Sequence, residues 1–417
     1  MKVLWIVNMV LPPLAADLGI KTGNSGTWMF DIAKQLDADP GVQLAVACVY
    51  GDKFQMRRVG QTDYYCLPGT GRDMMFYRPR YQDYWKRIVD EFQPDVVNIH
   101  GTEYCHALSF LRAFPQIKTV ISLQGLMTKI QNYDLAGLSL WQLLRYRTLR
   151  EWIHLNGMLE YHFFHRKNAK SEAEMLRFVK YCMVVDSWHK SVAYEINPDL
   201  QFFTIKYNLR EAFYHSPKWD IQKIDRYTIT TNPGGTALKG LHQLFKAVAI
   251  VKNKYPTVKV RVPGMTANQN GLIGTSGYAK YLKSLIRELG IEKNVEFLGS
   301  QSSEKMVSNM LHAHIQVIPS AIEGPSLVLH EGMHLGTPSI ASFRGGMMDF
   351  IEDQKDGFLY DFGEYQYLAL RILQIFDSDE LAVKLSRNAI EKSEKVHNRA
   401  NNYQNYLKMY MEICKYS

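Results

Sequence analysis

Residues 315–342 read IQVIPSAIEGPSLVLHEGMHLGTPSIAS. The apolar run at the start of this stretch and the short run at its end each predict a buried strand. Between them, a helix is expected to begin near Ser326, whose hydroxyl can cap it, and to end before Gly336 and Pro338. A strand, a helix and a second strand joined by short connections are typical of a parallel sheet with helices packed on it.

The same alternation extends over most of the 417 residues, a length too great for one hydrophobic core. Strands are expected at residues 3–7, 44–50, 96–100, 119–123, 181–185 and 202–206 and, after a polar stretch near 214–224, at 227–231, 258–262, 295–298, 315–319 and 339–342. Two successive units of this kind predict an α/β protein in which two Rossmann-like domains face each other across a cleft.

The composition favours a soluble protein with anionic partners. The formal net charge is +8, and 46% of the residues are hydrophobic. A basic chain attracts phosphorylated small molecules, acidic lipid surfaces or nucleic acid, although a basic surface kept for solubility has the same composition. Five widely spaced cysteines favour a reducing compartment. The first apolar run is interpreted as a buried strand instead of a signal peptide, and no run is long enough to span a bilayer.

Two glutamates in the stretch quoted above suggest a ligand. Ligands of open α/β sheets bind beyond the carboxyl ends of the strands, where the amides of Gly324, Ser326 and Leu327 suit a phosphate. Glu323 precedes the helix and Glu331 lies further back. Because a carboxylate accepts hydrogen bonds from adjacent hydroxyls, the pair fits a sugar–phosphate–ribose ligand and needs no protein partner. An ordinary turn acid and a solvated helix position are the alternatives.

Four blocks of sequence, in order, resemble the retaining GT-B glycosyltransferases of family 4, the group 1 glycosyltransferases. EGPSLVLHE is a Glu-x7-Glu motif inside a longer similar signature, EGxSLVLxEGMxxGTPxIAS. The other blocks are TALKGLHQLFKAVAIVKNKYPTVKVRVPG, VEFLGSQSSEKMVSNMLHAHIQVIPSAIEG and GGMMDFIEDQKDGFLYDFGE. The resemblance covers about residues 227–390. We expect an acceptor-binding domain at 1–215, a nucleotide-sugar domain at 216–390, and a helical segment at 391–417 that packs back on the first domain.

The resemblance assigns roles to matching positions. Glu331 would hold the ribose hydroxyls of a nucleotide-sugar, Glu323 would contact hydroxyls of the donor sugar, and Lys239 would neutralise the departing diphosphate. The other donor positions are Gly324, Pro325, Ser326 and Leu327 along the sugar and diphosphate, and Gly264, Leu298 and Gly299 near the base.

The chain departs from the family at one donor position. Members commonly have an arginine five residues before the lysine, and Gly234 stands there in this sequence. Either another basic residue such as Arg344 substitutes, or the diphosphate depends more on backbone amides.

The resemblance is weaker before residue 227. TGNSGTWMFDIAKQL is similar to the loop that opens a helix facing the donor phosphate, with Gly26 on the donor side and Gly23 towards the acceptor. Gln124, on the acceptor side, stands where many members have a histidine. His100 is the candidate catalytic group, and a structural histidine at a strand end is the alternative.

The family's chemistry implies no cofactor besides the nucleotide-sugar donor. In retaining members the departing diphosphate is thought to take the acceptor proton, so that no general base is required. The acidic pairs Asp37 with Asp39 and Asp377 with Asp379 resemble helix-end and turn acids, and we expect no metal.

Residues 138–170 depart from the alternation of strands and helices. Core or partly buried packing is the favoured interpretation, and contact with an anionic membrane is the alternative. Nucleic-acid binding has little support, because no recognised motif accompanies the charge. The segment combines the aromatic residues Trp141, Trp152, Tyr161, Phe163 and Phe164 with the basic residues Arg145, Arg147, Arg150, Arg166, Lys167 and Lys170.

The sequence therefore predicts a cytoplasmic enzyme, with peripheral contact with the inner face of the membrane as a further hypothesis. It would move a hexosyl group from a UDP- or GDP-sugar to a saccharide or lipid-linked acceptor, with retention, in bacterial surface polysaccharide synthesis. A nucleotide-sugar isomerase or hydrolase of the same fold, and a non-catalytic sugar-nucleotide-binding module, are the alternatives.

Overall fold

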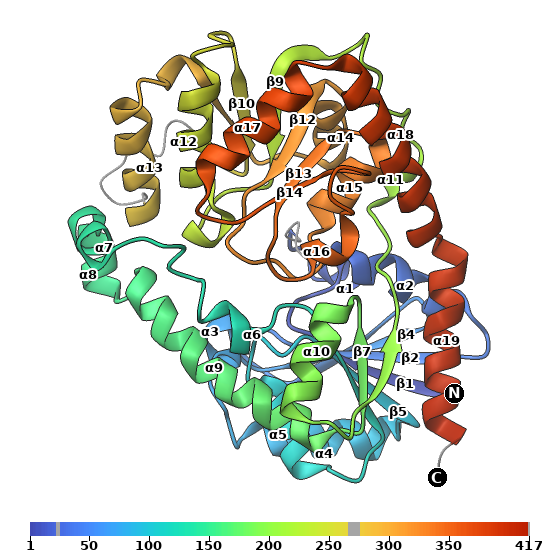
Figure 1. Ribbon diagram of the computed structural model, residues 1–417. Coiled ribbons are helices and arrows are strands. Elements are labelled where there is room, and N and C mark those ends of the chain that lie inside the picture. Colours follow the sequence, from blue (N-terminus) through green and yellow to red (C-terminus); the bar gives the residue numbers. More distant parts are fainter. Residues whose placement is uncertain (22–25, 266–275, 416–417) are drawn as a thin grey trace. The chain divides into compact units, whose positions relative to one another are not determined.

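A computed structural model describes residues 1–21, 26–265 and 276–415 (Figure 1). The chain forms two compact units, one from Met1–Lys129, His165–Asn208 and the segment from His397 onward, the other from Ile130–Phe164 and Leu209–Val396. Residues 130–164 were expected in the first domain. They join the second unit because Tyr146 packs on Tyr281 and the Glu151 carboxylate accepts a hydrogen bond from the Gly277 amide.

Within the described residues, the first unit holds a sheet with the strand order β3-β4-β2-β1-β5-β6-β7-β8. Neighbouring strands are parallel, except that β3 runs antiparallel to β4. The strands are β1 (Lys2–Ile6), β2 (Gln43–Val49), β3 (Gln55–Val59), β4 (Thr62–Leu67), β5 (Val96–His100), β6 (Thr119–Ser122), β7 (Tyr181–Val184) and β8 (Gln201–Thr204). Neither strand of the β3–β4 hairpin was predicted. β3 is a largely exposed edge strand with little apolar signal, and β4, although buried, begins with the polar residues Thr62 and Asp63.

The described part of the second unit holds a sheet with the order β11-β10-β9-β12-β13-β14, in which all neighbours are parallel. Its strands are β9 (Asp225–Thr231), β10 (Lys259–Pro263), β11 (Val295–Gly299), β12 (Ala313–Ile318), β13 (Ser339–Ser342) and β14 (Phe358–Tyr360). β14 was missed because three residues are too few to show a period. Together the two sheets confirm the α/β class.

Helices accompany both sheets (Figure 1). Those in or entering the first unit are α1 (Pro12–Asp17), α2 (Thr27–Ala38), α3 (Gly71–Met74), α4 (Tyr81–Phe92), α5 (His106–Ala113), α6 (Met127–Ile130), α9 (Met158–Phe178), α10 (Ser187–Ile196) and α19 (Arg399–Lys415). Those of the second unit are α7 (Leu140–Tyr146), α8 (Leu149–His154), α11 (Glu211–Tyr214), η1 (Ala237–Lys239), α12 (Leu241–Val251), α13 (Gly277–Glu288), η2 (Glu292–Asn294), α14 (Ser303–Leu311), α15 (Leu327–Leu335), α16 (Met347–Phe350), α17 (Tyr365–Phe376) and α18 (Asp379–Val396).

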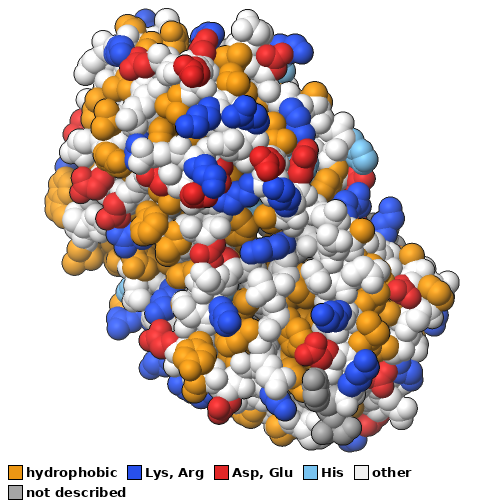
Figure 2. Space-filling model, turned by 45° about the vertical axis from the view of Figure 1, so that its right-hand side comes forward, with side chains coloured by type: hydrophobic (Ala, Val, Ile, Leu, Met, Phe, Trp, Pro, Cys, Tyr) orange, Lys and Arg blue, Asp and Glu red, His pale blue; other side chains and the backbone are white. Residues whose placement is uncertain are grey.

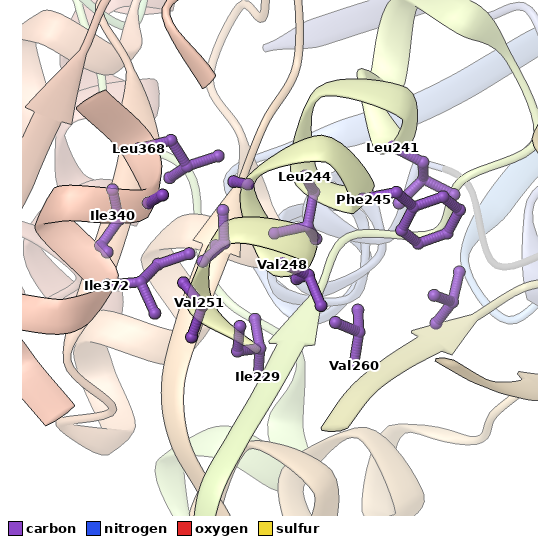
Figure 3. Packing of buried hydrophobic residues seen from close by; sticks show 14 of the residues in the cluster. Ile229, Leu241, Leu244, Phe245, Val248, Val251, Val260, Ile340, Leu368 and Ile372 are labelled. Atoms are coloured by element: carbon purple, nitrogen blue, oxygen red, sulfur yellow. The ribbon is translucent and has the colours of Figure 1, made fainter. Parts of the chain in front are cut away.

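The core of the second unit forms where α12 packs on the sheet (Figure 3). Leu244 and Val248 lie among the aliphatic side chains of Ile229 on β9 and Val260 on β10, and all four are fully buried. Burying one such side chain contributes about 1.5–3 kcal/mol. Helix α17 packs beside α12, whereas α14 packs beside α15. This packing holds the carboxyl ends of the strands in fixed positions.

The last helix completes the core of the first unit. The Tyr410 hydroxyl of α19 accepts hydrogen bonds from Trp5 Nε1 at 2.9 Å and from Asn98 Nδ2 at 2.7 Å. All three side chains are buried. A C-terminal helical segment was expected to pack on the first domain, and α19 does so, whereas α18 belongs to the second unit.

The surface view shows basic and acidic side chains interspersed over one face (Figure 2). No helix in the described part of the chain is both long enough and apolar enough to cross a membrane.

Candidate functional site in the second unit

Glu323 follows the carboxyl end of β12, and one of its oxygens is held by three donors. Oε1 accepts hydrogen bonds from Lys239 Nζ at 2.6 Å, Ser320 Oγ at 2.7 Å and Asn232 Nδ2 at 3.3 Å. Among the described residues, none donates a hydrogen bond to Oε2. The carboxylate is therefore fixed through one oxygen, and the other has acceptor capacity for a ligand.

The loop that carries Lys239 is tied to the same strand end. The Ala321 amide donates to the Leu238 carbonyl at 2.7 Å. Gly240 follows with a φ of 70°, and a Cβ on it would lie 1.7 Å from the Pro319 carbonyl oxygen. Only glycine fits this close approach. Lys239 and Glu323, proposed separately from the sequence, are thus in direct contact.

The turn after β13 supports Glu323 from the other side. The Gly346 amide donates to the Glu323 carbonyl at 3.0 Å, and a Cβ on Gly345 would lie 2.0 Å from that oxygen. Arg344, next in the turn, donates to Asp361 at 2.6 Å and to the Tyr133 hydroxyl at 3.4 Å. Arg344 therefore lies one residue from this bridge, with its guanidinium engaged by Asp361.

Helix α15 begins without a side-chain cap. Ser326 occupies the cap position, but its hydroxyl makes no capping hydrogen bond, so the expected Ser326 cap is wrong. Gly324, Pro325, Ser326 and Leu327 form the connection from Glu323 into the helix. The positive end of the helix and its first amides thus follow Glu323 directly in the chain, an arrangement that suits an anion.

Glu331 has a protein partner that the sequence did not reveal. Arg210 binds it through two parallel hydrogen bonds, Nε to Oε1 at 2.6 Å and Nη2 to Oε2 at 2.7 Å. Burial raises the pKa of the Glu331 carboxyl, and the Arg210 guanidinium opposes that shift. The expectation that neither glutamate needs a protein partner is therefore wrong, since Glu323 pairs with Lys239 and Glu331 with Arg210.

The expected base-side positions lie at the ends of β10 and β11. The Gly264 amide donates to the Gly299 carbonyl at 2.7 Å, and the Gly299 amide donates to the Met265 carbonyl at 2.6 Å. A Cβ on Gly264 would lie 2.9 Å from Pro233 Cβ. The structure therefore brings Gly264, Gly299 and the adjacent Leu298 together beside the loop after β9.

Leu241 fills the space beside Gly234. A Cβ on Gly234 would lie 2.2 Å from Leu241 Cδ1, and Leu241 is fully buried in the core. Any side chain at residue 234 therefore requires this leucine to move. The absence of an arginine at residue 234 therefore goes together with the position of Leu241, which leaves no room for a side chain there.

Residues 225–392, which contain this arrangement, match the family model for glycosyl transferases group 1. This part of the chain belongs to the group 1 glycosyltransferases. The resemblance predicted from the four sequence blocks is confirmed.

Curated relatives match a little over a third of the chain. A D-inositol 3-phosphate glycosyltransferase of Corynebacterium urealyticum is 33% identical over 158 residues, which cover 36% of this chain and 35% of that protein. The putative colanic acid biosynthesis glycosyltransferase WcaL of Escherichia coli is 27% identical over 166 residues, covering 37% of this chain and 38% of the relative. The matched part thus spans a little over a third of the length of these relatives.

Solved structures extend the likeness to the whole chain. Sucrose-phosphate synthase from Thermosynechococcus elongatus has a TM-score of 0.75 at 15% identity, over 100% of both chains. Anabaena Alr3699/HepE in complex with UDP-glucose has a TM-score of 0.67 at 16% identity, over 99% of this chain and 100% of that one. At these identities the likeness shows the fold, and the predicted GT-B architecture of two Rossmann-like units is confirmed.

In the first unit, the two predicted side chains His100 and Gln124 are buried. His100 ends β5 against the ring of Trp5, with centroids 4.2 Å apart. Neither ring nitrogen of His100 has a partner among the described residues, and burial lowers the pKa of this histidine to about 3. Gln124 accepts a hydrogen bond from His189 Nε2 through its backbone carbonyl. His100 is therefore neutral around pH 7.

Two acids in the same unit, Glu172, which is buried, and Glu103, which is partly buried, were not predicted. Glu172 accepts hydrogen bonds from the Thr102 and Thr128 hydroxyls and from the amides of Met127 and Thr128. Glu103 accepts one from the Gly125 amide at 2.6 Å, and burial raises its pKa to about 7. Each belongs to a polar stretch without a recognised motif, so the sequence carried no signal for them.

The expected phosphate-facing loop is described only in part. Gly26 has a φ of 73° at the start of α2, and a Cβ on it would lie 2.2 Å from Met9 Sδ. Gly23 lies outside the described residues.

The aspartates of the two acidic pairs, which were expected to be helix-end and turn acids, have protein partners. Asp39 binds Tyr403, Asp377 binds Lys254, and Asp379 pairs with Arg226. Asp37 accepts from the Thr62 hydroxyl at 2.7 Å. No cluster of three or more possible metal ligands occurs in residues 1–21, 26–265 and 276–415.

Proposed function

We propose that the protein is a retaining glycosyltransferase that moves a hexosyl group from a UDP- or GDP-sugar to a saccharide or lipid-linked acceptor. The observation that carries the proposal is the Glu323 carboxylate, whose Oε1 is fixed by Lys239, Ser320 and Asn232 while Oε2 has no donor among the described residues. A sugar hydroxyl is a suitable donor for that oxygen.

The proposed reaction uses positioning and charge. The bond between the sugar C1 and the phosphate oxygen breaks, the acceptor oxygen bonds to C1, and the acceptor proton moves to the departing diphosphate. Lys239 supplies fixed positive charge where negative charge develops. The first amides of α15 add donors for phosphate oxygens. No metal ion or cofactor is part of this scheme, and Glu331, held by Arg210, faces the ribose.

The comparisons support the choice of donor and setting. Alr3699/HepE was solved with UDP-glucose, and WcaL is named for colanic acid biosynthesis. We extend these features to this chain as a proposal: a nucleotide-sugar donor, and a role in bacterial surface polysaccharide synthesis at the cytoplasmic side of the membrane.

A thermal-shift panel of UDP-, GDP- and ADP-sugars tests the donor, because a ligand that binds the folded state raises Tm. We expect one nucleotide class to raise Tm, and Glu323→Gln to abolish most transfer while nucleotide binding remains. Glu352→Gln, an exposed acid of the same unit, is the matched control. Unchanged transfer in Glu323→Gln would refute the catalytic assignment.

Incubation without acceptor separates the rival functions. An isomerised or hydrolysed sugar nucleotide at the full rate would identify an isomerase or hydrolase. Nucleotide binding without turnover, across a panel of saccharide and lipid-linked acceptors, would identify a binding module.

A further inference from the structure

Residues 140–163 hold an unusual concentration of exposed apolar side chains. Trp141 and Trp152 are 61% and 52% exposed, and Leu149 and Ile153 are more exposed still. We call the set on α7, α8 and the start of α9 the aromatic surface; its members are Leu140, Trp141, Leu144, Leu149, Trp152, Ile153, Leu155, Tyr161 and Phe163. Core or partly buried packing was the favoured interpretation; the two tryptophans, Tyr161 and Phe163 are about half exposed or more, so none of these four side chains is in the core.

The opposite side of this segment is anchored. Tyr146 packs on Tyr281 of α13, with ring centroids 5.3 Å apart, and its hydroxyl donates to Ser284 at 3.0 Å. Capping boxes at Ser139 and Thr148 start α7 and α8. The aromatic surface is therefore preformed on short helices that are held on the second unit.

The two acids of the segment, Glu151 and Glu160, and Asp134 just before it have partners within the second unit. Glu151 accepts from the Thr148 and Gly277 amides, Glu160 binds Arg147, and Asp134 binds His162. The charge of Glu160 is paired with Arg147, and the carboxylate of Glu151 is buried against the two amides, so neither presents an unpaired negative charge on the outward face.

The exposed residues Arg145 and Arg150, by contrast, have no carboxylate partner among the residues that the structure describes. Neither Arg145 nor Arg150 forms an ion pair with any residue that the structure describes, and both are exposed. The Arg145 guanidinium carbon lies 4.7 Å from the Trp141 ring centroid, so charge and apolar surface adjoin. The outward face is thus apolar with a net positive charge.

We propose that the aromatic surface docks on an anionic lipid bilayer. Tryptophan, leucine and isoleucine side chains insert at the level of the headgroups, and arginines beside them attract anionic phosphates. A protein partner would have to match an apolar face bordered by unpaired cations, whereas an acidic bilayer offers both features at once. The proposal concerns the surface alone and does not depend on sugar transfer.

Vesicle partition of the full chain tests the docking, with phosphatidylglycerol–phosphatidylcholine vesicles and pure phosphatidylcholine vesicles compared. We expect binding to the anionic vesicles, a blue shift of tryptophan fluorescence, and weak binding to the neutral ones. Arg145→Gln with Arg150→Gln should lower partition by about 30-fold. Trp141→Ser with Trp152→Ser should lower it by at least about tenfold.

Matched variants on α17 and α18 control for changes in general surface properties. Leu370→Ser with Val383→Ser removes comparably exposed apolar side chains, and Lys384→Gln with Arg387→Gln removes two exposed charges. Both should bind vesicles as the wild type does, with unchanged Tm. Absence of vesicle binding, or equal losses in test and control variants, overturns the proposal. A dimer that dissociates on Trp141→Ser with Trp152→Ser, without vesicle binding, would instead assign the surface to a second copy.

Discussion

Each unit contains two carboxylates of interest, but the partners of these carboxylates differ between the units. In the second unit, Glu323 and Glu331 each contact a basic side chain, Lys239 and Arg210. In the first unit, Glu103 and Glu172 accept hydrogen bonds from amides and hydroxyls, and neither forms an ion pair within the described residues. In the second unit these carboxylates are therefore held in ion pairs. In the first unit they have neutral partners, and burial favours their protonated form.

The difference agrees with the proposed roles of the two units. A diphosphate carries several negative charges and needs fixed cations, such as Lys239 beside Glu323 in the second unit. An acceptor hydroxyl is neutral, and a neutral polar environment suits it. Four substitutions test this contrast, from the largest expected effect to the smallest.

Arg210→Met removes the partner of a buried carboxylate. Breaking such a pair leaves an uncompensated charge and should lower the free energy of unfolding by about 3–5 kcal/mol near pH 7.5. The pKa of Glu331 is already raised by burial, so the stability this group contributes is greatest at acidic pH and declines as pH rises. The deficit of the variant should therefore shrink towards pH 5 in urea titrations. Arg226→Met, at an exposed pair, is the control, and an equal loss there would contradict the contrast.

Lys239→Met removes the cation beside Glu323. Transfer should fall by about 10²–10³-fold, because fixed charge no longer stabilises the departing diphosphate. Steady-state kinetics with the donor found by thermal shift measure this loss. Lys246→Met, at a lysine on α12 that stacks over Tyr365, should change the rate little. Similar rates in both variants would remove Lys239 from the proposed chemistry.

Glu103→Gln tests the first unit through pH. The carboxyl has a pKa of about 7 in the fold against 4.5 as its ordinary value. A raised pKa means that its contribution to stability is complete below pH 4.5 and is lost as pH rises through 7. The wild type should lose about 2.5 kcal/mol more than the variant between pH 5 and 8. Parallel pH profiles for the wild type and Glu103→Gln would show that this carboxyl is ionised throughout, and Glu195→Gln, at an exposed acid, should give that parallel result.

Gly234→Arg introduces the arginine that the family commonly has. Its Cβ would meet Leu241, so we expect a loss of about 1–3 kcal/mol in stability and no gain in transfer. Gly235→Arg is the matched control, because a Cβ there has no atom within 4 Å. Faster transfer in Gly234→Arg at unchanged Tm would contradict this prediction and show that Leu241 can move aside without loss of stability.

Sequence periodicity predicted most of both sheets because their strands are short buried runs between helices. It failed at β3, which is exposed, at β4, which begins with polar residues, and at β14, which has three residues. The glutamates and Lys239 were found through the family motif. Arg210 was missed because it lies 121 residues from Glu331 in the chain, and only the fold joins them.

The segment 138–170 shows a second limit. Its composition was compatible with both core packing and membrane contact. The sequence could not show which individual side chains are buried and which are exposed. The structure separates Arg147, which is bound to Glu160, from Arg145 and Arg150, which are exposed. Burial of a particular arginine or tryptophan depends on tertiary contacts that no local pattern encodes.

The hydrogen bond between Trp5 and Tyr410 joins residues 405 positions apart. Synthesis at 5–20 residues per second separates these two residues by roughly 20 to 80 s. During that interval the first sheet exists without α19, and the Trp5 and Asn98 donors lack their hydroxyl acceptor. Synthesis of the first unit thus begins before that of the second unit, but its last helix is made only after the second unit has been synthesised.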